Sequence, residues 1–381
     1  MRLMKKLIRV TTVDLSLYTL LKGQLRFLSD KFDVVALAAD TGVLKAVGER
    51  EGVRVIDVPM HREISLLSDF RSLFRLMKVF RKEKPDIVHA NTPKGSLLSM
   101  IAAKLSGVPT RIYLVTGLRY QGFSGWRAML LKTMERITCA FATKVIPEGK
   151  GVKDTLIRDR ITKKDLEIIH NGNINGIDPA FFSREACTET REEVRARLGL
   201  PDNVFTFIFI GRMVKDKGMN ELADAIRDIS LIHPELKVIL VGAFESELDP
   251  LAPGNEDFFK SSPNVIYVGR QSDVRPYLMA ADSLVFPSYR EGFPNVVLQA
   301  GAMDLPMIVT DINGCNEVVE DGVNGVIIPP RNKEALKQAM LAFLDNPMMA
   351  EQMSKQSREM VVSRYNQEDF WNSLLAMYNS L

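Results

Sequence analysis

Short runs of β-branched and other apolar residues alternate along this chain with longer stretches of helical periodicity. The first series of apolar runs is LIRVTTV, FDVVALA, VRVIDVP, DIVHAN, TRIYLVT and KVIP, and the second is VFTFIFIG, LKVILVG, VIYVG, SLVFPS, PMIVT and GVIIP. Alternation of this kind is typical of parallel strands that are joined by crossover helices. The sequence therefore predicts an α/β protein with two Rossmann-like, doubly wound parallel sheets.

The segment HNGNINGIDPAFF, residues 170–182, separates the two series. Its Asn and Gly residues favour a loop, which is a natural hinge. The 381 residues also exceed what one hydrophobic core usually holds. We expect an N-terminal domain over residues 1–170 and a C-terminal domain over residues 171–381, whose last helix is able to pack back on the first. Ligands of open α/β sheets bind at the carboxyl ends of the strands, so the two domains are expected to face a central cleft.

Cysteine usage and hydropathy indicate the compartment. The three cysteines, Cys139, Cys187 and Cys315, are widely spaced and fit neither a disulfide framework nor a zinc site. The apolar run VFTFIFI is far shorter than a membrane span, and TTVD follows the opening stretch MRLMKKLIRV at once. We therefore expect a cytoplasmic protein without a signal peptide or a transmembrane helix.

The net charge of +3 conceals opposite charges in the two halves. Residues 1–170 contain 31 basic and 17 acidic residues, a net charge of +14, whereas the remainder contains 19 and 30, a net charge of −11. A basic first half favours an anionic partner, either a phosphate-bearing substrate or a lipid surface. Nucleic acid is not expected, because the basic residues are not interleaved with aromatic residues and no zinc-finger or RNP pattern is present.

The segment SDFRSLFRLMKVFRKEK, residues 68–84, has the period of an amphipathic helix. The positions with core spacing are Phe70, Leu73, Phe74, Met77 and Phe80. Another face repeats the basic residues Arg71, Arg75, Lys78 and Lys82. That face is either solvated surface or a dock for the headgroups of an anionic membrane, and the second alternative predicts a peripheral protein on the inner face of the membrane.

The loop GRMVKDKG follows the buried run VFTFIFI and leads into a helix. Arg212 and Lys217 therefore lie near the carboxyl end of a strand, where an anion binds in open sheets. A guanidinium fork and an ammonium point charge together suit a departing diphosphate. Cations in such loops are often only solvated, so the pattern alone leaves the function open.

A second candidate segment is EGFPNVVLQA, residues 291–300. It follows the strand SLVFPS, and Pro294 suits the first turn of a helix. The free N–H groups of that turn favour phosphate or sugar oxygens. Glu291 and Gln299 are thus candidates to face one ligand, the alternative being an ordinary helix-approach carboxylate and an ordinary polar helix residue.

These segments, together with the tail GCNEVVEDGVNGVIIPPRN after IVTD, resemble the donor-binding half of the family-four retaining glycosyltransferases of the GT-B fold. The resemblance is dense from residue 170 to about residue 332 and covers most of the chain. In the first half, LLKGQL resembles the Gly loop near the phosphates, and DIVHANTPKGSLLSMIAA and IYLVTGLR resemble acceptor-side segments. Within the family, the chain is most similar to transferases that extend lipid-linked saccharides for capsule, O-antigen or protein glycans.

The resemblance implies roles for individual residues. Arg212 and Lys217 would hold the diphosphate, and Glu291 would lie by the donor sugar. The remaining donor-binding positions are Gly23, Gly292, Phe293, Pro294, Asn295 and Gln299. The acceptor-side positions are His89, Lys94, Thr116 and Gly117. The donor would be a nucleotide sugar, UDP-linked by expectation, and the acceptor a saccharide or a lipid-linked saccharide.

Two positions depart from the family pattern. Gln299 replaces the second Glu of the E-x7-E pair, and Thr116 replaces the His before Gly117. A Gln amide can still bond a ribose diol because it has a donor and an acceptor. Thr116 lacks a ring that donates to a sugar hydroxyl, and His89 and Lys94 are candidates to compensate, although a His in VHA is more often a core residue.

No Asp-x-Asp pair occurs in the sequence, and the carboxylates show no metal-ligand cluster. Arg212, Lys217 and helix N-termini are therefore expected to supply the electrostatic stabilisation, without a metal or another cofactor. A nicotinamide dehydrogenase is excluded because no G-x-G-x-x-G follows a strand. The alternatives that stay open are an epimerase or phosphorylase of the same fold and, above all, a non-catalytic sugar-nucleotide-binding subunit, which Gln299 and Thr116 would suit.

Overall fold

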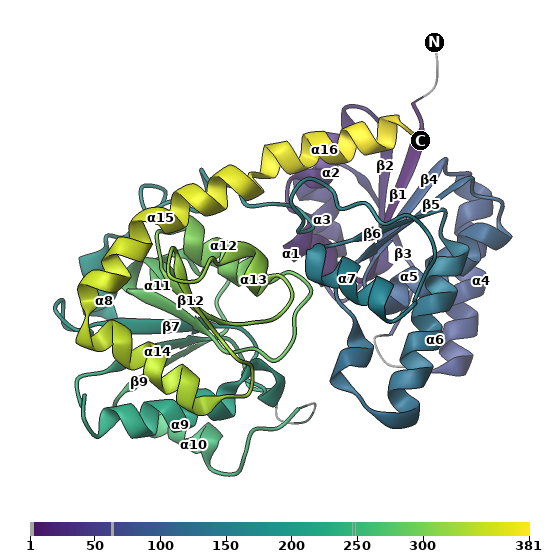
Figure 1. Ribbon diagram of the computed structural model, residues 1–381. Helices are drawn as coiled ribbons and strands as arrows, with labels where there is room; N and C mark the ends of the chain where they lie inside the picture. The colour runs from purple at the N-terminus through teal and green to yellow at the C-terminus, as the bar shows by residue number, and fades with distance from the viewer. Residues whose placement is uncertain (1–3, 62–64, 246, 248) are drawn as a thin grey trace. The chain divides into compact units, whose positions relative to one another are not determined.

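The computed structural model describes residues 4–61, 65–245, 247 and 249–381, and the first three residues of the opening stretch lie outside these ranges. The chain forms two compact units (Figure 1). Unit 1 contains Met1–Gly176 and Glu368–Leu381, and unit 2 contains Ile177–Gln367. Each unit has a six-stranded parallel sheet, so the predicted fold class is confirmed.

The sheet of unit 1 has the strand order β3-β2-β1-β4-β5-β6. Its strands are β1 (Lys6–Val13), β2 (Asp33–Ala39), β3 (Arg54–Asp57), β4 (Ile87–Asn91), β5 (Thr110–Val115) and β6 (Lys144–Pro147). In the register of the central strands, Leu7 lies beside Val34 on one side and Ile87 on the other. Strands β1 and β4 are buried along nearly their whole length. Burial on both faces explains why they are continuous apolar runs in the sequence.

Helices cover both faces of this sheet. They are α1 (Asp14–Leu20), α2 (Gln24–Ser29), α3 (Leu44–Glu51), α4 (Leu66–Glu83), α5 (Pro93–Leu105), α6 (Gly125–Phe141), α7 (Lys150–Arg158) and α16 (Gln367–Asn379), with a 3-10 turn η1 (Arg119–Gly122). Helices α4 to α7 pack in one core with Leu76, Phe80 and Met100. Helices α1, α2, α3 and α16 pack in the core on the other face, which includes Leu25 and Phe370.

The sheet of unit 2 has the order β12-β11-β10-β7-β8-β9. Its strands are β7 (Thr206–Ile210), β8 (Lys237–Val241), β9 (Val265–Gly269), β10 (Ser283–Phe286), β11 (Met307–Thr310) and β12 (Gly325–Ile328). Its helices are α8 (Arg191–Arg197), α9 (Met219–Ser230), α10 (Asn255–Ser261), α11 (Arg275–Ala280), α12 (Asn295–Ala302), α13 (Cys315–Val318), α14 (Lys333–Asp345) and α15 (Pro347–Tyr365), with a 3-10 turn η2 (Lys215–Lys217). Counted along the chain within each unit, both sheets have the Rossmann order 3-2-1-4-5-6.

The strand order reverses direction between β1 and β4 in unit 1 and between β7 and β10 in unit 2. Open α/β sheets bind ligands at this topological switch point, outside the carboxyl ends of the strands. In unit 2, the loop after β7 carries Arg212 and Lys217, and the loop after β10 carries Glu291. The topology therefore brings the predicted donor-binding loops to one position.

Helix α4 differs from the expectation in the face that it buries. Phe80 is buried and Leu73 and Met77 pack at the edge of the core, as predicted. Phe70 and Phe74 are 59% and 65% exposed, so their assignment to the core is wrong. The buried stripe instead runs through Ser72, Leu76 and Phe80, because the helix has two apolar stripes and only one of them faces the sheet.

In the part of the chain that the structure describes, no helix is both long and apolar enough to cross a bilayer.

Candidate active site

Arg212 and Lys217 lie in the loop that follows β7. The strand is held by fully buried Phe207 and Phe209, so the loop begins at a fixed point of the sheet. The guanidinium of Arg212 is about half exposed, at 54%, and its Nη1 lies 2.8 Å from Oε2 of Glu245. Lys217 ends the single turn η2 and is largely buried.

Gly218 fixes the position of Lys217. Its φ is 72°, and a Cβ at this position would collide with the carbonyl oxygen of Pro287. Only glycine meets both conditions, because a side chain is disfavoured at this φ and has no room. The end of η2 is thereby pressed against the loop after β10, next to Glu291.

The carboxylate of Glu291 accepts contacts from two donor side chains. The ammonium group of Lys217 contacts its Oε1, and the Ser288 hydroxyl donates a hydrogen bond of 2.9 Å to the same oxygen. The side chains of Lys217 and Glu291 are only 16% and 17% exposed. The Lys217 ammonium also lies 5.4 Å from the centre of the Phe286 ring. Lys217 and Glu291 therefore form a largely buried pair of opposite charges.

The backbone of EGFP is held from the other side by Gly314. Its φ is 75°, and a Cβ would lie 2.6 Å from Cδ of Pro294 and 2.7 Å from Cα of Phe293. Cys315, which follows, is fully buried. Burial raises the pKa of the Cys315 thiol, and the nearby Glu291 carboxylate raises it further. The site therefore contains a neutral thiol rather than a thiolate.

Helix α12 begins at Asn295, with Pro294 at the N-cap rather than inside the first turn. Gly292, Phe293 and Pro294 are buried, whereas Asn295 and Gln299 are half-buried. The predicted residues from Glu291 to Asn295 are thus brought together at one helix start. Gln299 lies one turn further along the same helix.

Two further contacts in this region are not evident from the sequence. The Arg290 guanidinium lies 2.5 Å from the Asp216 carboxylate. The Tyr289 hydroxyl donates to Glu221 at 2.7 Å, and burial raises the pKa of that hydroxyl. Both contacts join the loop after β10 to the η2–α9 segment. They hold the two loops that carry Lys217 and Glu291 in register.

Gly23 in unit 1 has a structural reason to be glycine. Its φ is 80°, and a Cβ would lie 2.7 Å from the indole of Trp371 in α16. Its N–H donates to Glu51 at 3.0 Å. The Trp371 indole in turn donates to Asn175 at 2.7 Å. Packing of α16 therefore accounts for Gly23, and its predicted approach to the donor phosphates remains a prediction.

His89 lies in the core of unit 1 and is fully buried. Its Nδ1 lies 2.6 Å from the Tyr378 hydroxyl, which also accepts a hydrogen bond of 3.0 Å from Arg9. Burial lowers the pKa of His89, and the Arg9 charge lowers it further. This is the core histidine that the sequence offered as the alternative. We therefore leave His89 out of the proposed acceptor site.

The other acceptor-side candidates follow the neighbouring strands β4 and β5. Lys94 is in the first turn of α5, and its Nζ lies 2.7 Å from the Asp69 carboxylate. Thr116 and Gly117 come directly after β5 and are half-exposed. Strands β4 and β5 are parallel neighbours, so Lys94 and the turn that contains Thr116 and Gly117 lie on the same edge of the sheet.

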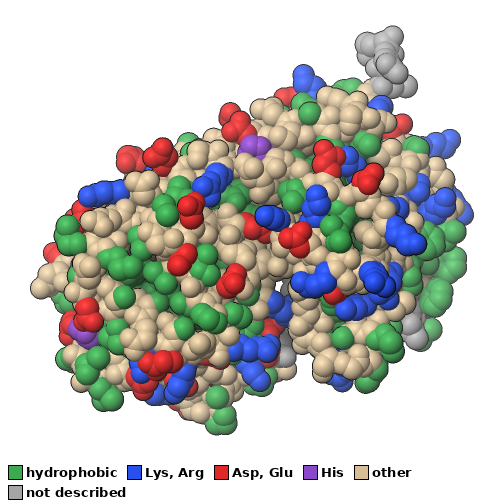
Figure 2. All heavy atoms as spheres, viewed as in Figure 1, with side chains coloured by type: hydrophobic (Ala, Val, Ile, Leu, Met, Phe, Trp, Pro, Cys, Tyr) green, Lys and Arg blue, Asp and Glu red, His purple; other side chains and the backbone are tan. Residues whose placement is uncertain are grey.

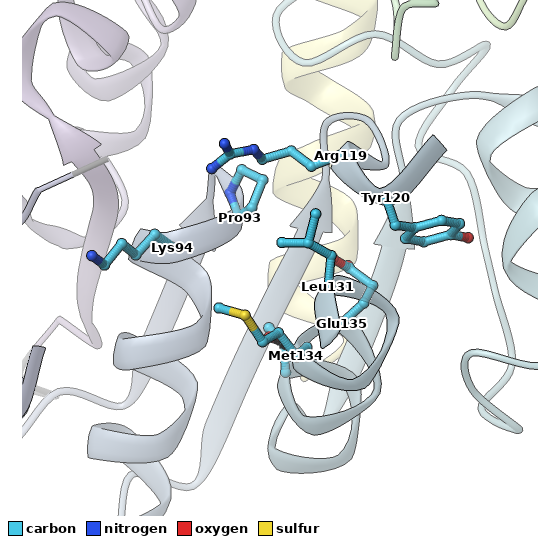
Figure 3. Close-up of a pocket in the computed structure, with 8 residues that line it drawn as sticks. Pro93, Lys94, Arg119, Tyr120, Leu131, Met134 and Glu135 are labelled. Carbon is cyan, nitrogen blue, oxygen red and sulfur yellow. Dashed lines mark hydrogen bonds between the residues drawn. The ribbon is translucent and has the colours of Figure 1, made fainter. Parts of the chain in front are cut away.

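A pocket opens beside Lys94 (Figure 3). Its lining is Pro93, Lys94, Arg119, Tyr120, Leu131, Met134, Glu135 and Thr138. In Figure 3, Arg119 reaches from η1 over Pro93, while Leu131, Met134 and Glu135 come from α6. Two cations thus lie at a pocket with apolar walls. Arg119 belongs to the acceptor-like segment IYLVTGLR, but nothing in the sequence singled it out.

Glu135 is the buried carboxyl group of this pocket. The Tyr113 hydroxyl donates to its Oε1. Burial raises the pKa of Glu135 to about 7, although the hydrogen bond from Tyr113 opposes this shift. No sequence pattern distinguishes Glu135, because a single Glu in an amphipathic helix is usually exposed.

Two family models match the chain. The model described as Glycosyltransferase Family 4 matches residues 16–173, and the model described as Glycosyl transferases group 1 matches residues 190–360. A capsular polysaccharide biosynthesis glycosyltransferase of Staphylococcus aureus, CapM, is 31% identical over 99% of this chain and 97% of the relative. The UDP-Gal:alpha-D-GlcNAc-diphosphoundecaprenol alpha-1,3-galactosyltransferase of Escherichia coli is 28% identical over 89% of this chain and 86% of the relative.

Solved structures agree on the fold. The crystal structure of Anabaena HepE in complex with UDP-glucose has a TM-score of 0.80 at 19% identity, over 99% of this chain and 100% of that chain. With two Rossmann-ordered sheets, both family models and a relative similar over its full length, the chain belongs to the family-four glycosyltransferases of the GT-B fold.

Proposed function

We propose that this glycosyltransferase moves a sugar from a UDP-sugar to a saccharide acceptor carried on a polyprenyl diphosphate, with retention of configuration and without a metal ion. The UDP-linked donor is supported by the named activity of the E. coli relative and by UDP-glucose in HepE. The lipid-linked acceptor is supported by the same relative, whose name specifies a diphosphoundecaprenol acceptor. The place of the reaction in surface polysaccharide synthesis is supported by CapM.

The contact between Lys217 and Glu291 is the observation that carries this proposal. In a sugar nucleotide, the anomeric carbon is bonded directly to a diphosphate oxygen. A cation for the leaving diphosphate and a carboxylate for the positive charge at the anomeric carbon must therefore be neighbours. Lys217 and Glu291 meet this requirement, and both are held in largely buried positions, where electrostatic stabilisation is stronger than in water.

In the reaction that we assign to these residues, one bond to the anomeric carbon breaks and another forms. The bond between the anomeric carbon and the diphosphate oxygen breaks, and its electron pair goes to the diphosphate. The acceptor hydroxyl oxygen bonds to the same face of the sugar, and its proton leaves with the diphosphate. Arg212 and Lys217 stabilise the charge that grows on the diphosphate, while the start of α12 offers N–H groups to sugar and phosphate oxygens.

Metal independence is proposed because the chain supplies its own cations at the leaving group. Arg212 lies near the beginning of the loop after β7, and Lys217 lies near its end. Among the described residues, no group of three or more His, Cys, Asp or Glu side chains is placed to hold a metal ion. Carboxylates near Arg212 and Lys217 are instead engaged with these cations, as Glu245 and Glu291 are.

A non-catalytic sugar-nucleotide-binding subunit is the second candidate, and the departures at Gln299 and Thr116 favour it. The two functions are separated by measuring binding and turnover in one preparation. A thermal-shift screen across UDP-, GDP- and ADP-sugars identifies the donor, and addition of the sugar to a lipid-linked saccharide is then followed by mass spectrometry. We expect a stabilising UDP-sugar and addition of one sugar. Binding of the donor without turnover on any lipid-linked acceptor would favour the binding subunit.

A further inference from the structure

Helix α4 exposes an apolar stripe that has no partner among the described residues of unit 1. Leu67, Phe70 and Phe74 are 78%, 59% and 65% exposed. Their spacing of three and four residues places them on one side of the helix. The exposed basic residues Arg71, Arg75, Lys78 and Lys82 follow the adjacent stripe of the same helix.

Helix α6 repeats this arrangement. Its exposed apolar residues are Trp126, Met129, Leu130 and Ile137. The spacing again gives a single stripe along the outside of the helix. Phe123 is exposed just before the helix begins, and Arg127 and Arg136 are exposed beside the stripe.

The two helices share one face of unit 1. Both pack against α5, and their inner sides contribute to the same core. Each follows a strand of a parallel sheet, so both start at the carboxyl edge of that sheet. We call their exposed apolar and basic residues the α4–α6 face. Figure 2 shows green and blue side chains next to each other at the right edge, where α4 lies.

The carboxylates of these helices are turned away from the α4–α6 face. Asp69 pairs with Lys94, and Glu83 pairs with Lys6 and Arg54. Glu135, the acidic residue of α6, is buried beside Tyr113. The face therefore presents apolar and basic side chains without an acidic residue from either helix.

We propose that the α4–α6 face docks unit 1 on an anionic lipid bilayer. The apolar side chains enter the zone between headgroups and acyl chains, where Trp and Phe are favoured. The basic side chains contact the anionic headgroups. This inference goes beyond the proposed reaction, because the residues that carry it are not those that would bind the donor.

Charge and shape favour a bilayer over a protein partner. The apolar residues lie on convex helix surfaces rather than in a groove, so they offer no pocket for the side chains of a partner. The cores of protein interfaces are also depleted of Lys, whereas an anionic bilayer attracts Lys side chains. The pocket with Lys94 and Arg119 lies between the start of α5, the turn η1 and the middle of α6, so docking through α6 would bring it close to the headgroups of lipid-linked acceptors.

Vesicle flotation without donor or acceptor tests the proposal. We expect the protein to float with vesicles of phosphatidylglycerol and phosphatidylethanolamine and not with pure phosphatidylcholine. The paired variants Phe70→Ser/Phe74→Ser and Trp126→Ser/Met129→Ser should each lower the partition coefficient at least tenfold. Replacing the four basic residues of α4 by Gln should lower it by about 600-fold, since each basic residue near an anionic surface contributes about fivefold.

A matched control is available in unit 2. Leu231 and Ile232 are 84% and 64% exposed at the end of α9, and they lie outside the α4–α6 face. Leu231→Ser/Ile232→Ser should leave flotation unchanged. An equal loss in this control would mean that general hydrophobicity, and not the α4–α6 face, drives association.

Tryptophan fluorescence reports the insertion directly, because the chain has only two Trp residues, Trp126 and Trp371. In Trp371→Phe, the emission of Trp126 should shift to shorter wavelength on anionic vesicles and should be quenched by brominated acyl chains. An unshifted spectrum on bound vesicles would overturn the proposed orientation.

Equal binding to neutral and anionic vesicles, or self-association of the protein through this face in place of flotation, would overturn the lipid assignment. Sugar transfer to a water-soluble acceptor analogue distinguishes the docking proposal from the proposed reaction. The serine variants should retain that activity, and loss of flotation with retained activity leaves the proposed reaction untouched.

Discussion

The ammonium group of Lys217 contacts Oε1 of Glu291, which links the loop after β7 to the loop after β10 at the switch point of unit 2. Neither side chain is free in the absence of a donor. A diphosphate that binds Lys217 would share the ammonium group with Glu291 or displace Glu291 from it. Glu291 would then face the sugar. In the proposed reaction, the pair would therefore join the stabilisation of the leaving group to that of the reacting carbon.

Lys217→Ala and Arg212→Ala are each expected to lower the rate of transfer by two to three orders of magnitude, about 3–4 kcal/mol of transition-state stabilisation. The reason is the loss of a cation at the departing diphosphate. Steady-state kinetics with the identified UDP-sugar measures the effect. Lys215→Ala is the matched control, because Lys215 is an exposed cation of the same loop. Near-normal rates in both site variants would remove the diphosphate assignment.

Glu291→Gln is expected to lower kcat steeply with little change in donor affinity, because its charge is worth more at the developing positive centre than in the ground state. Gln299→Leu should raise KM for the donor with kcat largely kept, as expected for a ribose contact. Gln299→Glu should be tolerated. Kinetics at saturating acceptor compares the three variants. If Gln299→Leu loses kcat as severely as Glu291→Gln, the division of roles is wrong.

Activity is expected to persist in excess EDTA, since Arg212 and Lys217 are proposed to supply the positive charge at the leaving group. The rate of sugar addition is measured after dialysis against EDTA and again after addition of Mn²⁺ or Mg²⁺. Loss of activity in EDTA that Mn²⁺ restores would contradict metal independence.

Glu135 is expected to make the folded protein less stable as pH rises from about 4.5 to about 7. Its pKa is raised from 4.5 to about 7 by burial, so the folded chain keeps a proton that the unfolded chain releases in this interval. The free energy of unfolding therefore falls as pH rises. Glu135→Gln retains an acceptor for Tyr113 and should flatten this dependence. Urea denaturation at about pH 5, 6, 7 and 8 measures it, and equal slopes in both proteins would show that Glu135 is not responsible.

The two sheets could be predicted from the sequence because buried parallel strands are continuous apolar runs, as β1 and β7 are. The positions of Arg212, Lys217 and Glu291 after strands at a switch point could also be predicted, because strand ends can be located from the order of the elements. The contact between Lys217 and Glu291 could not be predicted. That contact depends on the close approach of Gly218 to Pro287, which is a property of the packed loops.

Spacing alone also could not orient α4. Phe74 and Leu76 belong to two different apolar stripes of the helix. Leu76 is buried and Phe74 is exposed, because only the stripe with Leu76 faces the sheet. The contact of His89 with Tyr378 joins residues 289 positions apart, so no local sequence pattern predicts it. Glu135 was missed for the same reason, since its burial follows from the packing of α6 on β5 and from the hydroxyl of Tyr113.

Transfer with retention is tested most directly by the NMR anomeric coupling of the product formed from the identified UDP-hexose and a polyprenyl-diphosphate-linked saccharide. We expect one added hexose with the anomeric configuration that it had in the donor. A product of inverted configuration, or a bound donor that adds no sugar to any lipid-linked saccharide, would contradict this expectation.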